Sequence, residues 1–362
     1  MTDTDVGSAR PLRGQPMLLG FPLPVCADIV LGAHWFSDAP FVRSIDHLDR
    51  IVHRVAGFSV LSGFRHERSV CRWAGDRCFS DIAAVVISIA LAERCIARGV
   101  LVAGTVGMGA GEFAAAHIAG ALSLEETIKA VHDLCEDGDD ARSSRRSVVL
   151  ASGIRSARAL CLMAGGEACV AMHLGIGETV LTGTPGGIRA VKRLCDALDM
   201  RIRDVSIHGS LLGSACQPTH ELQSVSSTPA ETPVPSIYSA AVVRKLTRED
   251  LRPGHAQRIL RNTGLWLQVI LSAERDLQAP VLQFSPSTCL SHHSDVTFTP
   301  DFFARPRIAP PVFGARDTPE HAAAFPEALF SKAFTADRTR AEVGSLFIRR
   351  ELRVGVTSVV TA

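Results

Sequence analysis

The stretch that decides the fold of this chain reads Val106-Gly107-Met108-Gly109-Ala110-Gly111-Glu112-Phe113. The apolar run that precedes it, residues 99–106, predicts a buried strand. The alanine-rich segment that follows it, residues 113–122, predicts a helix. Glycines between a strand and a helix permit positive φ angles and a close approach of the backbone. The stretch therefore predicts a sharp strand-to-helix turn.

A turn of this kind carries the nucleophile in many hydrolytic and acyl-transfer enzymes, where its pattern is G-x-S-x-G. The outer glycines of that pattern are present as Gly107 and Gly111. The central position, however, is Gly109 instead of serine. The sequence thus predicts the elbow without its hydroxyl group.

The same glycines also suggest a dinucleotide-binding loop, whose pattern is G-x-G-x-x-G. Counted from Gly107, the position of the third glycine is occupied by Glu112. Its carboxylate would stand at the helix N-terminus, where the pyrophosphate of such a cofactor binds. The spacing and the charge both argue against this alternative, and no cofactor is expected.

The segment resembles the acyltransferases that load malonyl units onto acyl carrier proteins in fatty-acid and polyketide synthesis. Their pattern is G-H-S-x-G-E, followed by small residues and then A-G-A-L-S-L-E-[DE]. Gly107, Gly111, Glu112 and residues 119–126 match this pattern. The histidine and the serine are replaced by Met108 and Gly109. The resemblance implies an α/β fold, with an α/β-hydrolase-like large subdomain and an inserted ferredoxin-like small subdomain.

Apolar patterning gives a matching division of the chain. The segment 147–207 contains apolar elements in the order β-α-β-β-α-β, which is typical of the ferredoxin-like motif. The large subdomain is predicted to span residues 16–146 and 208–293. A flexible leader is expected at residues 1–15, and a C-terminal extension of unknown role at residues 294–362. Within the large subdomain, helical spacing predicts helices over residues 39–55, 81–98, 113–122, 124–135 and 257–272.

The resemblance also identifies positions at which the chemistry of the family is altered. Pro24 stands where a glutamine helps to form the oxyanion hole, and proline has no amide hydrogen to donate. Counted without gaps from Gly109, the arginine that holds the malonyl carboxylate becomes Leu134. The catalytic histidine aligns with Ser210 or, if two residues are deleted, with His208.

Two functions therefore stay open. The chain is expected to belong to polyketide or fatty-acid biosynthesis, without ordinary malonyl transfer, as a partner of an acyl carrier protein or of a polyketide synthase component. The alternative is an enzyme with altered chemistry on an acyl-CoA or another acyl-thioester, either acyl transfer or hydrolysis. Such an enzyme would need another nucleophile, for which the candidates are Thr105, Ser210, Ser214 and Cys216.

Composition excludes several other classes. The 362 residues include 38 Lys+Arg and 37 Asp+Glu, so the formal charge of +1 gives no reason to expect nucleic acid or a membrane surface as partner. The longest apolar run, residues 82–92, is too short to span a bilayer. The N-terminus lacks an apolar signal core. The 10 cysteines form no C-x-x-C pair, so a cytoplasmic protein with reduced thiols and no metal site is expected.

Overall fold

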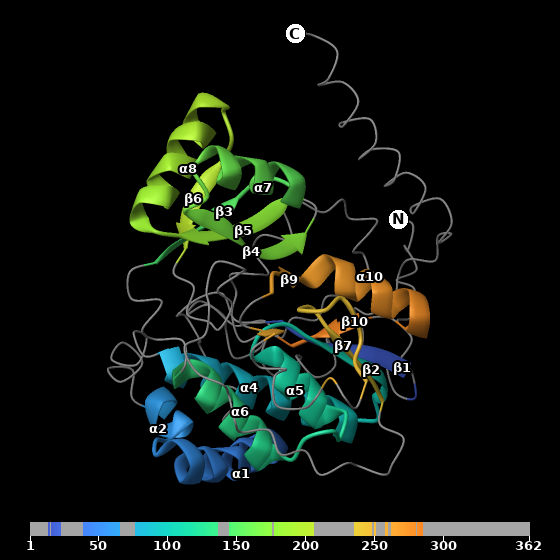
Figure 1. Cartoon of the computed structure of the whole chain (residues 1–362). Coiled ribbons are helices and arrows are strands. Elements are labelled where there is room, and N and C mark those ends of the chain that lie inside the picture. Colours follow the sequence, from blue (N-terminus) through green and yellow to red (C-terminus); the bar gives the residue numbers. More distant parts are fainter. Residues whose placement is uncertain are drawn as a thin grey trace, which may run out of the picture.

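The structure, a computed structural model, describes residues 14, 16–22, 39–65, 77–136, 145–175, 177–205, 235–247, 250, 258–259, 262–279 and 281–284. Two five-stranded sheets organise this part of the chain (Figure 1). The first sheet has the strand order β10-β1-β2-β7-β8, and all of its strands are parallel except β8. Its strands are β1 (Pro16–Phe21), β2 (Leu101–Gly107), β7 (Ser236–Ser239), β8 (Arg244–Lys245) and β10 (Val281–Gln283).

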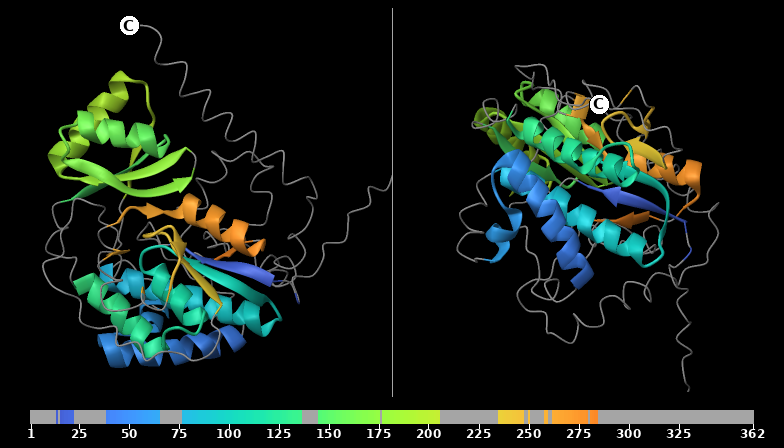
Figure 2. Two further views of the ribbon diagram at one scale, coloured as in Figure 1. Left: turned by 45° about the vertical axis from the view of Figure 1, so that its right-hand side comes forward. Right: turned by 90° about the horizontal axis from the view of Figure 1, so that it is seen from below.

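Helices cover both faces of this sheet, as a mainly parallel sheet requires because both of its faces are apolar. One face carries α5 (Gly111–Ile118), with four further helices behind it. Helix α10 (Trp266–Leu277) lies on the opposite face (Figures 1 and 2). The helices behind α5 are α1 (Ala39–Ala56), α2 (Val60–Arg65), α4 (Arg77–Ala97) and α6 (Leu124–Glu136). Together they form the α/β fold that the sequence predicted.

The matched segment at residues 119–126 has a local physical role. Helix α5 ends at Ile118, and Gly120 follows with a φ of 78°. Ser123 then caps α6: its hydroxyl accepts the amide hydrogen of Glu126 at 3.2 Å, and the Glu126 carboxylate accepts that of Ser123 at 2.8 Å. This reciprocal capping box fixes where α6 begins. The helix predicted over residues 113–122 is therefore displaced, since it starts at Gly111 and is stopped before Gly120.

The second sheet has the order β6-β3-β5-β4-β9. Its first four strands are antiparallel neighbours and are joined through two helices in the predicted order β-α-β-β-α-β. These elements are β3 (Arg146–Leu150), α7 (Ile154–Met163), β4 (Ala168–Gly175), β5 (Glu178–Gly183), α8 (Pro185–Ala197) and β6 (Ile202–Val205). The boundaries assigned to the two subdomains stay predictions.

Alternate residues of the second sheet enter two different cores. On β3, Val148 packs with α7 and α8, whereas its neighbour Val149 belongs to the main core of the molecule. On β5, Leu181 likewise belongs to the core of α7 and α8, and its neighbour Val180 belongs to the main core. This is the period of two expected for a strand buried on both faces. The small sheet is thus a separate sheet, but one of its faces is part of the main core.

The helix predicted over residues 257–272 is confirmed from Trp266 onward but is interrupted at residues 264 and 265. Residues 264 and 265 form β9 (Gly264–Leu265), which pairs in parallel with β4, and the helix α10 begins only at Trp266. The Leu265 amide donates to the carbonyl of Ala240 at 3.1 Å, and the Thr263 hydroxyl donates to the carbonyl of Val170 at 3.1 Å. These long-range bonds hold the backbone extended, and helical spacing alone cannot reveal them.

Candidate functional site

The predicted elbow is present at the carboxyl end of β2, in the centre of the first sheet. Gly109 lies between the strand and α5 with a φ of 62°. The amides of Gly111 and Glu112 donate to the carbonyls of Met108 and Gly109, at 3.1 and 3.0 Å. A second strand end supports the turn, because the Met108 amide donates to the carbonyl of Phe21 at 3.1 Å. The turn is therefore tight and has a left-handed residue at its tip.

The outer glycines are required by close packing. A Cβ atom at Gly107 would lie 2.6 Å from the backbone nitrogen of Glu112. A Cβ atom at Gly111 would lie 2.8 Å from the carbonyl carbon of Phe21. Carbon atoms do not approach backbone atoms this closely without a shift of the backbone. The two glycines thus allow α5 to rest directly on the ends of β1 and β2.

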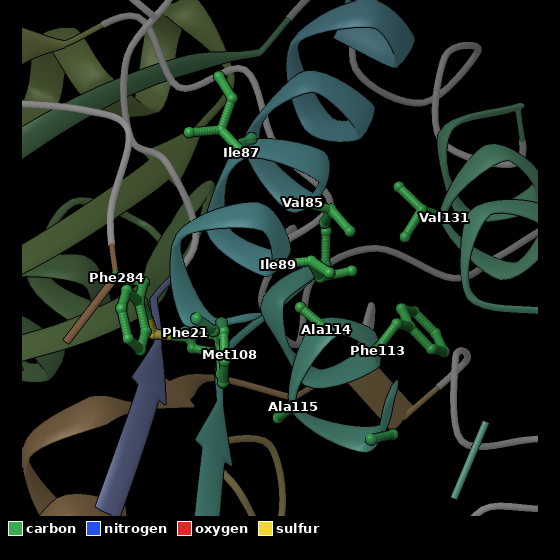
Figure 3. Close-up of a cluster of buried hydrophobic side chains, with 14 of the residues drawn as sticks. Phe21, Val85, Ile87, Ile89, Met108, Phe113, Ala114, Ala115, Val131 and Phe284 are labelled. Atoms are coloured by element: carbon green, nitrogen blue, oxygen red, sulfur yellow. The ribbon is translucent and has the colours of Figure 1, made fainter. Parts of the chain in front are cut away.

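The side chains around the turn are apolar (Figure 3). Met108 and Phe21 lie side by side at the ends of β2 and β1, and Phe284 adjoins them at the end of β10. The exposed fractions of these three side chains are 0%, 1% and 2%. The rings of Phe21 and Phe284 stack with centroids 5.5 Å apart. Positions 108 and 109, where the sequence resemblance predicts a replaced histidine and serine, thus hold a buried methionine and a glycine with a positive φ.

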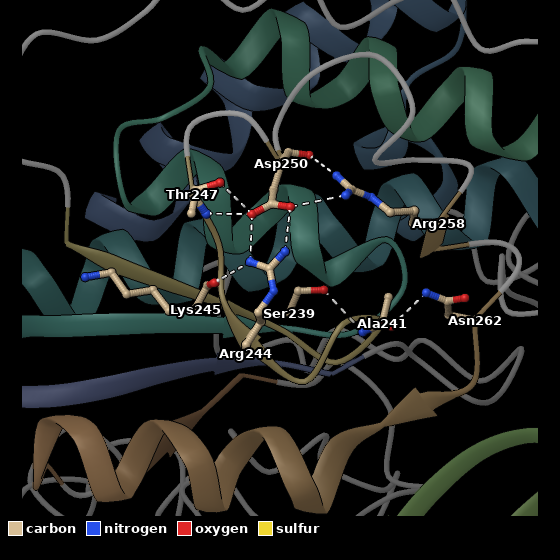
Figure 4. Close-up of polar contacts among 8 residues, drawn as sticks. All are labelled: Ser239, Ala241, Arg244, Lys245, Thr247, Asp250, Arg258 and Asn262. Atoms are coloured by element: carbon tan, nitrogen blue, oxygen red, sulfur yellow. Dashed lines mark hydrogen bonds and ion pairs between the residues drawn. The ribbon is translucent and has the colours of Figure 1, made fainter.

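Polar contacts on the other side of the elbow hold the segment after β7. The Ala241 amide lies 3.1 Å from Oε1 of the buried Glu112 and 3.2 Å from the Ser239 hydroxyl oxygen. The Ala240 amide donates to the Gly107 carbonyl at 3.0 Å, and the Asn262 side chain donates to the Ala241 carbonyl at 2.9 Å (Figure 4). Glu112, the acidic residue of the match to G-H-S-x-G-E, therefore joins the elbow to its neighbouring strand. Sequence analysis did not identify Ser239 or Asn262.

Next to this segment, Asp250 is the centre of an ion-pair network (Figure 4). Arg244 donates to its two carboxylate oxygens at 2.8 and 2.9 Å, and Arg258 donates to one of them at 3.1 Å. The amide and hydroxyl of Thr247 also donate to the carboxylate. The hydrogen bonds from Arg244 hold the pKa of Asp250 well below its ordinary value. No sequence motif predicted this network, because its members are charged residues of a polar segment without regular spacing.

Of the residues predicted for the site, Met108, Gly109 and Leu134 lie in the described structure. Met108 and Gly109 form the elbow, whereas Leu134 is fully buried on α6 within the main core. Pro24, His208 and Ser210 lie outside the described residues, as do the candidate nucleophiles Ser214 and Cys216. Thr105, the remaining candidate, is fully buried and donates its hydroxyl hydrogen to the Ala115 carbonyl at 3.0 Å. Its hydroxyl group is thus engaged in joining β2 to α5.

Two other potential nucleophiles in the described part, the thiols of Cys95 and Cys161, are unsuited to nucleophilic catalysis. Burial raises the pKa of the Cys95 thiol to about 12 and that of Cys161 to about 11, so both are protonated and unreactive near pH 7. Across the described segments, no three or more His, Cys, Asp or Glu side chains are grouped so that they could hold a metal ion. None of the helices that the structure describes is long and apolar enough to cross a bilayer.

The parallel sheet, the glycine elbow and the appended antiparallel sheet define an α/β protein of the acyltransferase class. The family model described as "Acyl transferase domain" matches residues 32–330, and the chain belongs to this family. A stretch of 121 residues is 32% identical to Erythronolide synthase EryA2 of Saccharopolyspora erythraea, and covers 33% of this chain and 3% of that protein. The chain therefore spans only a small part of that relative's length.

Solved acyltransferase structures share the fold. The loading acyltransferase of the avermectin modular polyketide synthase has a TM-score of 0.59 at 19% identity, over 78% of this chain and 92% of that one. The acyltransferase domain from the second module of the salinomycin polyketide synthase has a TM-score of 0.67 at 17% identity, over 88% and 73%. Malonyl CoA-acyl carrier protein transacylase from Clostridium perfringens has a TM-score of 0.65 at 13% identity, over 94% and 98%. The predicted acyltransferase family and α/β fold are confirmed.

Proposed function

We propose that this member of the acyl transferase family does not transfer malonyl groups through a serine ester and acts instead as a partner of an acyl carrier protein or of a synthase component. The observation that carries the proposal is the glycine at the tip of the elbow. Gly109 has no side chain to acylate, and the preceding residue is a fully buried methionine. Without a nucleophile the ester intermediate cannot form, and removal of this one group typically costs several orders of magnitude in rate.

The chain keeps the family's scaffold residues around the elbow, and this supports a binding role that depends on the fold and not on a nucleophile. The glycines, the capping box of α6 and the Glu112 contact to Ala241 all preserve the architecture around the elbow. These residues match the family pattern, whereas the reactive positions do not. Fold alone does not define function, but this division between scaffold and chemistry favours a protein that binds and does not react.

The test is intact-protein mass spectrometry after incubation with malonyl-CoA or with acetyl-CoA. We expect no acyl adduct, while the malonyl CoA-acyl carrier protein transacylase of Clostridium perfringens serves as the positive control. A stoichiometric acyl adduct would overturn the proposal and support the alternative of altered acyl-thioester chemistry. Peptide mapping of the adduct would then identify the nucleophile among the residues outside the described segments.

The partner role requires a second measurement. We expect the purified chain to form a stable complex with a purified carrier protein or a ketosynthase-containing synthase component, without turnover of the acyl-thioester. Steady hydrolysis of the acyl-thioester by the chain would contradict this role even if no adduct accumulates.

A further inference from the structure

The outer surface of α7 and α8 is both basic and apolar. The two helices pack against each other on the same sheet and lie at the edge of the molecule away from α1 (Figures 1 and 2). Their exposed side chains recur at helical spacing, at positions 155, 158 and 162 of α7 and at positions 189 and 193 of α8. We call this surface the basic face; it consists of Arg155, Arg158, Leu162, Met163, Arg189 and Arg193.

The charge of the basic face is not neutralised locally. None of its four arginines forms an ion pair with another residue in the described segments. By contrast, Lys192 of α8 lies 2.7 Å from the Asp204 carboxylate. Helix α7 has no acidic residue, and α8 has only Asp196. Helix α7 thus carries two arginines and no acidic residue, and α8 carries three basic residues and one acidic residue.

Two large apolar side chains lie next to these arginines. Leu162 is 77% exposed and Met163 is 64% exposed, and they rank among the large hydrophobic residues most exposed in the described part. Most apolar side chains of α7 and α8 are buried against the sheet. An apolar spot rimmed by charged residues is typical of a protein contact surface. The apolar spot favours a protein partner over the phosphate backbone of a nucleic acid, whose sequence-independent binding depends on basic groups.

We propose that the basic face docks an acidic, amphipathic helical surface of a carrier protein. Four arginines would pair with carboxylates of the partner, for which the planar guanidinium group is well suited. Leu162 and Met163 would bury an apolar side chain of the same partner helix between those ion pairs. This inference rests on the proposed function, since it names the surface through which the carrier protein would be held.

The experiment measures the affinity of the full chain for purified, phosphopantetheinylated carrier proteins, one from a fatty-acid synthase and one from a polyketide synthase module. Two charge-reversal variants, Arg155→Glu/Arg158→Glu and Arg189→Glu/Arg193→Glu, alter the basic face. The matched control is Arg43→Glu/Arg50→Glu, which reverses two exposed arginines on one side of α1. A third variant, Leu162→Ser/Met163→Ser, removes the apolar spot and retains the charge.

We expect each charge-reversal pair on the basic face to weaken binding by at least tenfold, and the α1 control to change it by less than twofold. Binding of the unaltered chain is expected to weaken as salt rises from about 50 to 300 mM, because the contact is ionic. Leu162→Ser/Met163→Ser is expected to weaken binding about fivefold and to reduce its salt dependence little. Because the altered residues are exposed, thermal unfolding of all variants should match that of the unaltered chain.

Distinct results would overturn the inference or the function beneath it. If the chain binds a carrier protein and the basic-face variants bind equally well, the docking surface is wrong and the proposed function stands. Equal losses in the α1 control would also overturn the docking surface, as would comparable binding of a DNA duplex. If the chain binds neither carrier protein, the proposed carrier-protein role fails together with the inference.

Discussion

At the scale of single residues, the glycines of the elbow have two different roles. Gly107 and Gly111 permit close packing, and Gly109 adopts a positive φ angle. Gly107 and Gly111 have no space for a Cβ atom, because backbone atoms of Glu112 and Phe21 occupy that space. Gly109 instead has a positive φ of 62°, which an L-residue adopts at a cost of about 1–2 kcal/mol. A glycine at position 109 thus avoids the strain that a serine would introduce at this turn.

We predict that Gly107→Ala destabilises the protein by about 2–4 kcal/mol, because the new methyl group must displace the backbone of Glu112. The control is Gly20→Ala on β1, where a Cβ atom would meet the Trp266 ring at 3.4 Å and Cγ1 of Val281 at 3.6 Å, which are ordinary contact distances. Urea unfolding measures both free energies. Equal losses for the two variants would show that the close approach at Gly107 is absent.

We predict that Gly109→Ser folds, with a loss of about 1–2 kcal/mol in the free energy of unfolding, and shows little or no malonyl transfer to a carrier protein. The new hydroxyl would lie beside the apolar Met108, and the sequence places Pro24 at the position of the oxyanion donor. Loss of one such donor costs roughly 3–4 kcal/mol of transition-state stabilisation. Transfer of radiolabelled malonyl groups measures the outcome.

Adding Leu134→Arg to Gly109→Ser is not expected to restore malonyl transfer. Leu134 is fully buried in the main core, where an unpaired guanidinium group would cost several kcal/mol of stability. Robust, malonyl-selective transfer by Gly109→Ser alone would show that the assignments of the arginine and the base to Leu134, His208 and Ser210 are wrong.

At the scale of secondary-structure elements, the segments that follow the strands determine the surroundings of the elbow. The short strand β8 turns back on β7, and Arg244 at its start reaches Asp250. Asn262 reaches back to Ala241 at the end of the same loop. Tyr238 of β7 donates to the Asp276 carboxylate of α10 at 3.0 Å, and burial raises the pKa of its hydroxyl to about 12. These contacts attach the β7–β8 turn to its neighbours on both sides.

We predict that Asp250→Asn lowers the free energy of unfolding by about 1–2 kcal/mol at pH 7. The value is below that of a fully buried pair, because both arginine side chains are partly exposed. The pKa of Asp250 is lowered in the folded state, so its stabilising effect is complete above the unfolded pKa of about 3.9 and is lost as the pH falls toward the folded value. The difference between variant and unaltered chain should therefore narrow below about pH 4.

Denaturant unfolding at pH 7, 4 and 3 measures this dependence. Asp204→Asn is the control, since its partner Lys192 lies on the surface and Asp204 itself is 75% exposed in its side chain. That variant should change stability by less than 0.5 kcal/mol at any pH. An Asp250→Asn effect that grows toward low pH would contradict the assigned direction of the pKa shift.

At the scale of the whole molecule, α10 and β9 join the two sheets. Helix α10 packs on the first sheet and also contacts β4 of the second. Its residue Gln268 lies with Nε2 2.8 Å from Nδ1 of the buried His173 on β4. Because the small sheet also contributes Val149, Ala171, Leu174 and Val180 to the main core, the two parts of the molecule share apolar surface.

We predict that the isolated segment 145–205 does not remain a monomer, because separation from the large part exposes the apolar face that contains Val149 and Val180. Val149→Thr/Val180→Thr should increase its monomeric fraction. The matched control is Val148→Thr/Leu181→Thr, on the opposite face and within the core of α7 and α8, which should unfold the segment. Size-exclusion chromatography and amide NMR spectra measure both outcomes. A monomeric, well-dispersed spectrum of the unaltered segment would show that the small sheet is independent of the main core.

The sequence by itself determined most of the helices and strands. It also determined the sharp turn between β2 and α5. The glycine-rich turn at residues 107–111 and the β-α-β-β-α-β order follow from turn residues and apolar spacing within short segments, so local patterning reveals them. The same stretch of sequence shows that position 109 is glycine and not serine.

Only the tertiary structure decided which faces and edges of these elements pack against each other. Strand β9 replaced part of a predicted helix, since pairing with β4 outweighs helical spacing over two residues. The Asp250 network joins residues that are close in the chain but follow no regular spacing. The contact of Glu112 with Ala241 and the two-sided burial of the small sheet join residues far apart in the chain. Such contacts arise from the packing of whole elements, and no local pattern encodes which side chains that packing brings together.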